Sequence, residues 1–237
     1  MEWYWILTIV LGSLLLLFLL SVILYKPFFK RFWDIFLALL ALSVFSWLFI
    51  ILTIIGAIAM KGNPFFVQKR PGKFKRNGEE KVFGLIKFRT MSNAKDKNGN
   101  LLPDDQRLNG YGKFLRKTSL DEFPEAINIL KGDMSVVGPR PLLIKYLPWY
   151  TKKERKRHCV RPGLTGYAQT HGRNNVIWEK RFEEDVYYVN HLSIWMDIYL
   201  IFRTIAVMFK HANIEVNALA DFDEYRKQQI NDGKIEL

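Results

Sequence analysis

The first 60 residues contain two long apolar stretches separated by a short basic linker. Residues 3–25 include no charged side chain and would form a helix about 34 Å long, which exceeds the roughly 30 Å hydrocarbon core of a bilayer. Trp3 and Trp5 lie at its start and Tyr25 and Phe28 at its end, as in interfacial aromatic belts. Because no Lys or Arg precedes the stretch, the pattern favours a transmembrane helix over a cleavable signal peptide.

The second apolar stretch, residues 35–60, is also uncharged but has basic residues on both sides. Lys26, Lys30 and Arg31 precede it, and further Lys and Arg residues follow within positions 61–76. Because positive residues prefer the cytoplasmic side, this stretch is expected to enter and leave the same leaflet as a broken, re-entrant helix. The alternative is an ordinary spanning helix, with the linker outside. Both topologies place the chain after residue 60 in the cytosol.

Beyond residue 60 the pattern changes to short runs of β-forming residues with turn residues between them. Residues 64–67 and 82–89 are predicted strands, and residues 70–72 and 76–78 contain the Pro and Gly of predicted turns. Residues 92–112 are polar and rich in turn formers, which is typical of a mobile loop.

The second half of the chain has mainly helical patterns. A helix is predicted over residues 120–130, and one long or two shorter helices over residues 179–210. Within the latter, residues 186–209 are apolar on much of the helix surface but interrupted by charged residues, which favours an interfacial or core helix over a spanning one. Residues 221–237 are polar and are expected to form a loosely held tail.

These patterns predict an α+β fold: a mainly helical, membrane-associated domain with a small β element. Four regions are expected, namely a transmembrane segment with its linker (1–30), a second membrane helix (31–61), a cytosolic domain with interfacial helices (62–220) and the polar tail (221–237).

The charge balance narrows the choice of binding partners. Lys and Arg number 35 against 23 Asp and Glu, which gives a net charge of +12. A basic and apolar chain suits an anionic membrane, a phosphate-rich ligand, or both. Nucleic acid is disfavoured because the apolar residues gather near the N-terminus. The single Cys159 cannot form an internal disulfide, which agrees with a domain in the cytosol.

One short segment carries a pair of adjacent carboxylates, Asp121 and Glu122. Ser119 and Glu122 match a capping box, which is a purely structural interpretation. The same helix start could bind a phosphate group, with Arg116 nearby, although two carboxylates would repel it. A divalent cation on one carboxylate, with the other acting as nucleophile, would resolve that conflict.

Cations elsewhere in the chain could complete such a site. Arg140 lies between Pro139 and Pro141, so its backbone is stiff and its guanidinium is suited to binding phosphate. Lys87 and Arg89 share one face of the second predicted strand. The structural alternatives are an exposed turn arginine and a solvated strand face.

Five motifs occur in order along the chain: Lys87-Phe88-Arg89-Thr90-Met91, Ser119-Leu120-Asp121-Glu122, Lys131-Gly132-Asp133-Met134-Ser135-Val136-Val137-Gly138-Pro139-Arg140-Pro141, Arg161-Pro162-Gly163-Leu164-Thr165-Gly166 and Asp185-Val186-Tyr187-Tyr188-Val189. Together they resemble the bacterial sugar transferase family, the monotopic polyprenyl-phosphate phosphoglycosyl transferases of capsule, exopolysaccharide and glycoprotein pathways. The resemblance extends over residues 30–209.

This resemblance implies an enzyme of the bacterial cytoplasmic (inner) membrane, with its catalytic domain in the cytosol. Asp121 would attack the β-phosphate of a UDP-sugar and expel UMP, and a polyprenyl (undecaprenyl) phosphate would then take the phosphosugar from the aspartyl intermediate. Glu122 would hold Mg²⁺, and Lys87, Arg116 and Arg140 would bind phosphates. No nucleic acid is expected as a partner, and the sugar, the pathway and the oligomeric state stay open.

The chain departs from the family pattern in its membrane region. Members of this kind break the re-entrant helix at a Ser-Pro pair, whereas this chain has Ser46-Trp47, leaving Ser43, Ser46 and Gly56 as weaker helix breakers. The segment over residues 3–25 is additional to the minimal family member.

Two other functions are weighed against this interpretation. Asp221-Phe222-Asp223 has the letters of an Asp-x-Asp glycosyltransferase motif but falls in the expected polar tail. A non-catalytic membrane adaptor could instead bind anionic lipid or nucleic acid through a basic cluster formed by Lys152, Lys153, Arg155, Lys156 and Arg157. Sugar specificity is expected to depend on residues 92–112 and 166–178.

Overall fold

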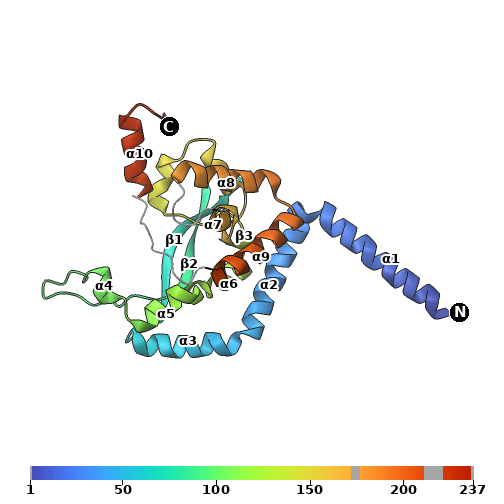
Figure 1. Ribbon diagram of the computed structural model, residues 1–237, viewed down its shortest axis with the longest axis horizontal. Helices are drawn as coiled ribbons and strands as arrows, with labels where there is room; N and C mark the ends of the chain where they lie inside the picture. The colour runs from blue at the N-terminus through green and yellow to red at the C-terminus, as the bar shows by residue number, and fades with distance from the viewer. Residues whose placement is uncertain (1, 172–176, 211–220, 236–237) are drawn as a thin grey trace.

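The computed structural model describes residues 2–171, 177–210 and 221–235, and it is mainly helical with two small sheets. The predicted α+β class is therefore confirmed. Helix α1 (Glu2–Ile23) projects away from the rest of the molecule (Figure 1), and no part of its apolar stretch Trp3–Leu20 is buried against other residues. It is the one helix in the described ranges that is long and apolar enough by itself to cross a membrane.

A short π-helical segment, η1 (Tyr25–Phe29), connects α1 to the second apolar stretch. That stretch forms two helices, α2 (Lys30–Val44) and α3 (Ser46–Ala59), which are bent by 68° relative to one another. The Ser46 hydroxyl donates to the Ser43 carbonyl at 3.0 Å, a local hydrogen bond that competes with helix continuation. Both serines thus lie at the break, as predicted.

Gly56, also predicted as a helix breaker, lies inside α3 and has a different role. A Cβ at this position would come within 2.7 Å of the Tyr111 hydroxyl oxygen. Tyr111 donates to the Leu52 carbonyl at 2.8 Å. The missing side chain therefore lets α5 (Gly110–Thr118) approach α3 closely instead of breaking the helix.

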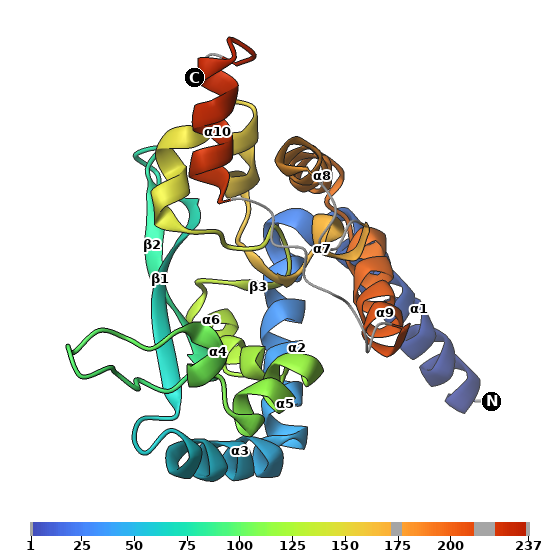
Figure 2. The same cartoon turned by 60° about the vertical axis from the view of Figure 1, so that its left-hand side comes forward.

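Strands β1 (Phe65–Phe74) and β2 (Glu80–Phe88) form an antiparallel hairpin that extends from the α3 end of the molecule toward α10 (Figure 2). The prediction of a turn at residues 70–72 is wrong, because this segment belongs to β1. The pairing register with β2 shifts there, between Pro71 and Phe74. The predicted turn at residues 76–78 joins the strands, with Gly78 at φ 82°.

The region expected to be a mobile loop includes the short helix α4 (Asp104–Arg107) and the start of α5. Phe88 at the end of β2 packs with Leu52 of α3 and Leu115 of α5 in one apolar cluster. This packing fixes the end of β2 against the helix that leads into the Asp121 segment.

A second sheet pairs β3 (Ser135–Val137) with β4 (Gly163–Thr165) in parallel. The chain approaches itself very closely just after β3: a Cβ on Gly138 would be 2.4 Å from the Arg161 carbonyl oxygen. The residues that lead directly into Pro139 and Arg140 are therefore held between backbone segments.

The remaining elements are mainly helical, and the predicted helical region over residues 179–210 is divided into two helices. The elements are η3 (Ile144–Trp149), η4 (Glu154–Cys159), α7 (Tyr167–His171), α8 (Trp178–His191), α9 (Ile194–Lys210) and α10 (Phe222–Asn231). Helix α10 overturns the expectation of a loosely held tail, because Phe222 and Arg226 are fully buried. Arg226 pairs with Glu154 at 2.6 Å, a contact across 72 residues of sequence.

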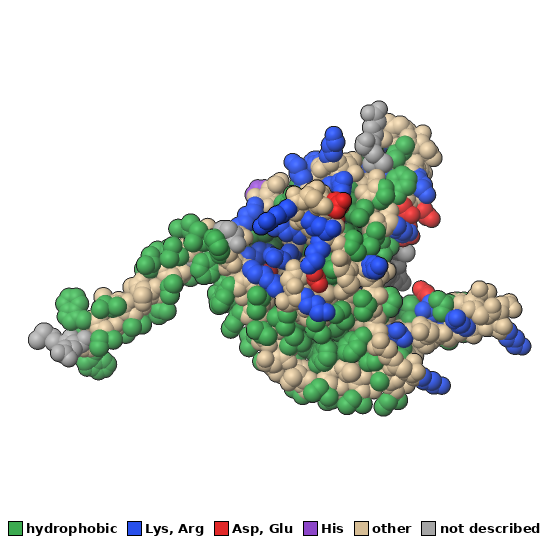
Figure 3. Space-filling view, turned by 180° about the vertical axis from the view of Figure 1, so that it is seen from behind, with side chains coloured by type: hydrophobic (Ala, Val, Ile, Leu, Met, Phe, Trp, Pro, Cys, Tyr) green, Lys and Arg blue, Asp and Glu red, His purple; other side chains and the backbone are tan. Residues whose placement is uncertain are grey.

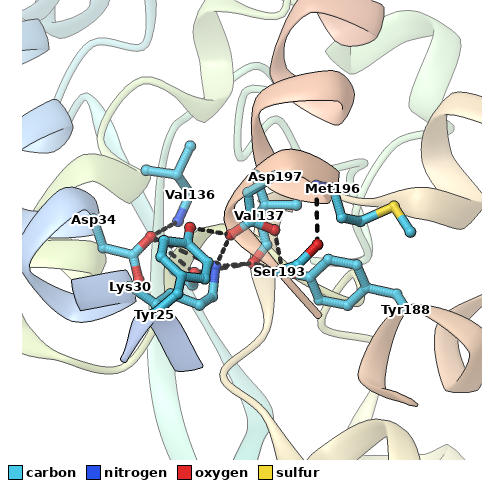
Figure 4. Close-up of polar contacts among 10 residues, drawn as sticks. Tyr25, Lys30, Asp34, Val136, Val137, Tyr188, Ser193, Met196 and Asp197 are labelled. Carbon is cyan, nitrogen blue, oxygen red and sulfur yellow. Dashed lines mark hydrogen bonds and ion pairs between the residues drawn. The ribbon is translucent and has the colours of Figure 1, made fainter. Parts of the chain in front are cut away.

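A buried polar junction connects η1 and the start of α2 to β3, α8 and α9 (Figure 4). Asp197 of α9 accepts hydrogen bonds from the Tyr25 hydroxyl and the Lys30 ammonium, both at 2.6 Å, and from the Tyr188 hydroxyl at 2.7 Å. Asp34 of α2 accepts from the backbone N–H of Val136 at 2.9 Å. We call this group the Asp34–Asp197 junction.

The outward surfaces of the apolar helices are exposed. Apolar side chains cover α1 and a band along the lower part of the body, and Lys and Arg side chains gather above that band (Figure 3). Helix α9 contributes exposed Trp195, Ile198, Phe202 and Ile205. Such an arrangement is suited to a bilayer and its headgroup region.

Candidate active site

The two adjacent carboxylates lie on a single tight turn, η2 (Leu120–Glu122), between α5 and α6 (Glu125–Lys131). The predicted continuous helix over residues 120–130 is therefore wrong at its start. Ser119 ends α5 in the left-handed conformation with φ 57°, whereas an N-cap residue needs extended backbone. The capping-box interpretation is also wrong, because Ser119 makes no side-chain cap and Glu122 bonds elsewhere.

Glu122 is held by two of the predicted phosphate-binding cations. Its Oε1 accepts from Lys87 Nζ at 2.7 Å and from Arg140 Nη2 at 2.6 Å. Although burial opposes ionisation, the cationic Arg140 and Lys87 outweigh it and lower the pKa of Glu122 to about 2. The carboxylate is therefore ionised at neutral pH and oriented by groups from β2 and from the segment after β3.

Asp121 has a different environment from its neighbour. Its side chain is half-buried, and within the described residues it forms no ion pair or hydrogen bond with another side chain. Burial and the adjacent Glu122 raise the pKa of Asp121, while Lys87 and Arg140 act in the opposite direction. Asp121 is thus a partly desolvated, uncommitted carboxylate beside two cations, which is the condition expected of a nucleophile that must reach a phosphorus atom.

A third carboxylate, Glu125, shares Lys87 with Glu122 and was not foreseen from the sequence. Glu125 Oε1 lies 3.1 Å from Lys87 Nζ, and the residue is only 3% exposed. Burial and then the Glu122 charge raise the pKa of Glu125 to about 7. Lys87 thus contacts two carboxylates, and the more buried of them, Glu125, titrates near neutral pH.

This shift predicts a pH dependence of stability. Because its pKa is higher in the folded than in the unfolded state, Glu125 contributes stability at low pH that is lost as pH rises toward and through about 7. The temperature at the midpoint of thermal unfolding should therefore decrease as the pH is raised from 5 to 8, and Glu125→Gln should make this decrease smaller. Glu79→Gln, at an exposed site, is the matched control. An unchanged pH slope in Glu125→Gln would exclude this role.

Four of the five predicted site residues come together, and the fifth lies on the neighbouring helix. Asp121, Glu122, Lys87 and Arg140 form one connected group. Arg116 is exposed on α5, where its Nε donates to the Thr90 hydroxyl at 3.1 Å just beyond β2.

The sequence did not predict that Arg157 and Asp185 together position Arg140. Arg157 was expected in an exposed basic cluster, but it is 2% exposed and donates to the Arg140 carbonyl at 2.7 Å. It also pairs with the buried Asp185 of α8, at 2.8 Å. Within the same cluster, Arg155 pairs with Glu80 at 2.7 Å. The lipid-binding surface required by the adaptor hypothesis therefore loses two of its five cations.

The Asp-x-Asp residues lie at the start of α10 and not beside Asp121. Asp221 and Asp223 both pair with Lys145 on η3, which gives them a structural role in docking α10. Of the two segments expected to determine sugar specificity, residues 172–176 lie outside the described residues.

The donor set at Asp121 and Glu122 partly suits Mg²⁺. Carboxylate oxygens are ligands that Mg²⁺ prefers, but Oε1 of Glu122 is already occupied by Lys87 and Arg140. Across the described ranges, no three Asp, Glu, His or Cys side chains form a metal cluster. Because Mg²⁺ commonly binds to one or two carboxylates together with substrate phosphates, the site fits an ion that shares its ligands with a diphosphate.

Comparison with known proteins identifies the family of this chain. Residues 25–211 match the family described as bacterial sugar transferase. A Bacillus subtilis protein named uncharacterized sugar transferase EpsL is 48% identical over 178 residues, which cover 74% of this chain and 85% of that protein.

Two further relatives have names that state a reaction. An Aeromonas hydrophila UDP-N-acetylgalactosamine-undecaprenyl-phosphate N-acetylgalactosaminephosphotransferase is 35% identical over 75% of this chain, and a Salmonella typhimurium undecaprenyl-phosphate galactose phosphotransferase is 34% identical over 77%. The chain spans less than half the length of both relatives, 43% and 41%. With the matched residues covering η1 to α9, the chain is a transferase that belongs to the bacterial sugar transferase family.

Proposed function

We propose that the protein transfers a sugar 1-phosphate from a UDP-sugar to a polyprenyl phosphate, such as undecaprenyl phosphate, and so initiates capsule, exopolysaccharide or other glycoconjugate synthesis. The names of the Aeromonas and Salmonella relatives support the reaction class. The observation that carries the proposal is the contrast within one turn, where Asp121 is uncommitted while Glu122 is fixed by Lys87 and Arg140.

The reaction would proceed in two displacements at the same phosphorus atom. First, a carboxylate oxygen of Asp121 bonds to the β-phosphorus, the bond to the bridging oxygen breaks, and UMP leaves with that oxygen and its electron pair. Next, a phosphate oxygen of the polyprenyl phosphate attacks the phosphorus and releases the Asp121 carboxylate, giving a polyprenyl diphosphosugar. Lys87 and Arg140 would provide positive charge before the anionic substrate arrives, which lowers the barrier to attack.

Mg²⁺ is proposed as the cofactor. Glu122 would hold it together with substrate phosphate oxygens, and the bound ion would neutralise phosphate charge. The low pKa of Glu122, about 2, supports this role because a metal-ligating carboxylate must be ionised. Lys87 and Arg140 would then be free to contact phosphate as well as the carboxylate.

We further propose that α1 crosses the bacterial cytoplasmic membrane and that α2 and α3 enter and leave its cytoplasmic leaflet. The 68° bend between α2 and α3 and the exposed apolar surface of α1 support this topology. Cysteines introduced at Lys26 and Phe28 should therefore be labelled from the cytoplasmic side by a membrane-impermeant reagent. Labelling from outside the cell would instead favour a spanning helix.

The proposed reaction is tested by screening UDP-sugars for UMP release. Purified protein, Mg²⁺ and polyprenyl phosphate should release UMP with one sugar or a narrow group of sugars. Incubation without the lipid should trap a phosphosugar on the peptide that contains Asp121, detectable by mass spectrometry. Turnover with no covalent species in rapidly quenched samples would contradict the two-step mechanism.

A further inference from the structure

Two arginines near Arg140 have no acidic partner. Arg70 of β1 donates to the Pro141 carbonyl at 3.3 Å and to the Gln68 side chain at 2.6 Å. Its Nε is buried and unpaired among the described residues. Burial, together with the nearby Arg140 charge, lowers the pKa of Arg70. Arg70 is therefore a partly desolvated cation held directly beside the Pro-Arg-Pro segment.

Arg181 lies on α8, the helix that carries Asp185. Its guanidinium lies over the Trp178 ring, 4.8 Å from the ring centroid, which fixes its direction. Asp185, one turn further along α8, binds the Arg157 that donates to the Arg140 carbonyl. The pKa of Arg181 is lowered by burial and by the Arg157 and Arg140 charges, while Asp185 opposes the change. Arg181 is thus connected to Arg140 through Asp185 and Arg157.

The charges around Arg140 do not balance. Arg140 and Lys87 face three carboxylates, Asp121, Glu122 and Glu125, and Arg157 pairs with Asp185, so adding Arg70 and Arg181 gives five cations against four carboxylates. Across the described residues, Arg70 and Arg181 have no ion-pair partner. Half-buried cations without a counter-ion carry a desolvation cost that an incoming anion would relieve. The arrangement is therefore suited to a ligand that carries negative charge on the side of Arg140 lined by β1 and α8.

The first displacement of the proposed function produces such an anion. When the bond between the β-phosphorus and the bridging oxygen breaks, the electron pair stays on that oxygen. The α-phosphate changes from a singly charged diester to a phosphate monoester dianion, so negative charge develops on the leaving nucleotide. The Arg140 guanidinium contacts Glu122, the neighbour of Asp121, while Arg70 donates to the carbonyl of the adjacent Pro141, so Arg140 connects the turn of the nucleophile to this side of the site.

We propose that Arg70 and Arg181 form a subsite for the phosphate of the departing nucleoside monophosphate. The inference rests on the proposed function, because that reaction is what supplies the nucleotide. The two arginines stabilise charge that is larger after bond cleavage than before it, so they favour the transition state over the bound substrate. The phosphate monoester of the acceptor lipid has the same chemistry and is the other ligand that this cluster could take.

Direct binding of UMP to the full-length protein in detergent tests the proposal without turnover. Arg181→Gln should weaken UMP binding at least tenfold by isothermal titration calorimetry, and it should lower kcat for UMP release. Arg181→Lys keeps the charge but loses the planar guanidinium, so an intermediate affinity is expected. Lys180→Gln removes the same charge from an exposed neighbouring position and should change UMP affinity less than twofold.

The outcomes separate the alternatives. Unchanged UMP affinity in both Arg181 variants, with native unfolding midpoints, overturns the proposal. A raised KM for polyprenyl phosphate with unchanged UMP affinity assigns the cluster to the acceptor lipid and also overturns it. If the wild-type protein does not release UMP from any UDP-sugar, the proposed function is refuted. If it does, but turnover is the same in the Arg181 variants, only the subsite is refuted.

Discussion

Asp121→Asn is expected to abolish UMP release from the preferred UDP-sugar, with a loss on the order of 10³-fold or more. An amide has nearly the same shape as a carboxylate but cannot attack phosphorus, so the first displacement stops. Folding should not suffer, because burial and Glu122 raise the pKa of Asp121 and a neutral side chain removes that unfavourable charge. The measurement is UMP release, with thermal unfolding in detergent as the test of folding.

Asp105→Asn makes the same chemical change at an exposed position on α4 and should retain wild-type activity. The adaptor hypothesis predicts no UMP release from wild type or variant, since a lipid-binding module does not use this carboxylate for chemistry. Binding to vesicles that contain anionic lipid should be equal in wild type and variant under both hypotheses. Retained UMP release in Asp121→Asn would therefore reject Asp121 as the nucleophile.

Asp185→Asn is expected to cause the largest loss of stability, about 3–5 kcal/mol, because it leaves the Arg157 charge buried without its partner. For a chain of this size the unfolding midpoint should fall by about 10 °C. UMP release should also fall, because the arginine that holds the Arg140 carbonyl is no longer fixed. Thermal unfolding and activity measured on the same samples give both effects.

Two further variants separate positioning from stability. Glu183→Gln, on the exposed face of the same helix, should have little effect on either measurement. Replacing the pair by apolar residues, as in Arg157→Met with Asp185→Leu, should recover much of the stability because no charge stays buried. Activity should not recover, since no side chain then donates to the Arg140 carbonyl. Full activity in the stabilised double variant would show that the pair has no positioning role.

Local patterns predicted the elements of this fold better than its long-range contacts. The two apolar stretches, the hairpin turn at residues 76–78 and the helices over residues 179–210 follow from periodicity and turn residues alone. The tail was misjudged because its polar composition hides Phe222 and Arg226, which are buried against partners far away in sequence. Composition reports average polarity, whereas docking depends on a few side chains.

The candidate site shows the same division. Residue types and spacing identified Asp121 and Glu122, but the local rule assigned Glu122 to Ser119. In the folded chain Glu122 is instead bound by Lys87 and Arg140, which are 35 and 18 residues away. Arg157 and Asp185 are 28 residues apart, and no local sequence pattern predicts that they pair. Charge-assisted bonds between distant residues override a weak capping preference.

The Asp34–Asp197 junction makes η1 and α2 one cooperative folding unit with β3 and α9. Tyr25 and Lys30 supply two of the three described donors to Asp197, and Asp34 binds the backbone of Val136, two residues before Gly138. In a chain without residues 1–60, Tyr188 would be the one remaining donor of these three to the buried Asp197. The backbone N–H of Val136 in β3 would also lose its hydrogen-bond acceptor, Asp34. Docking of the N-terminal helices is therefore a precondition for assembling the Arg140 segment, and on the topology proposed above the active site would mature only at the membrane.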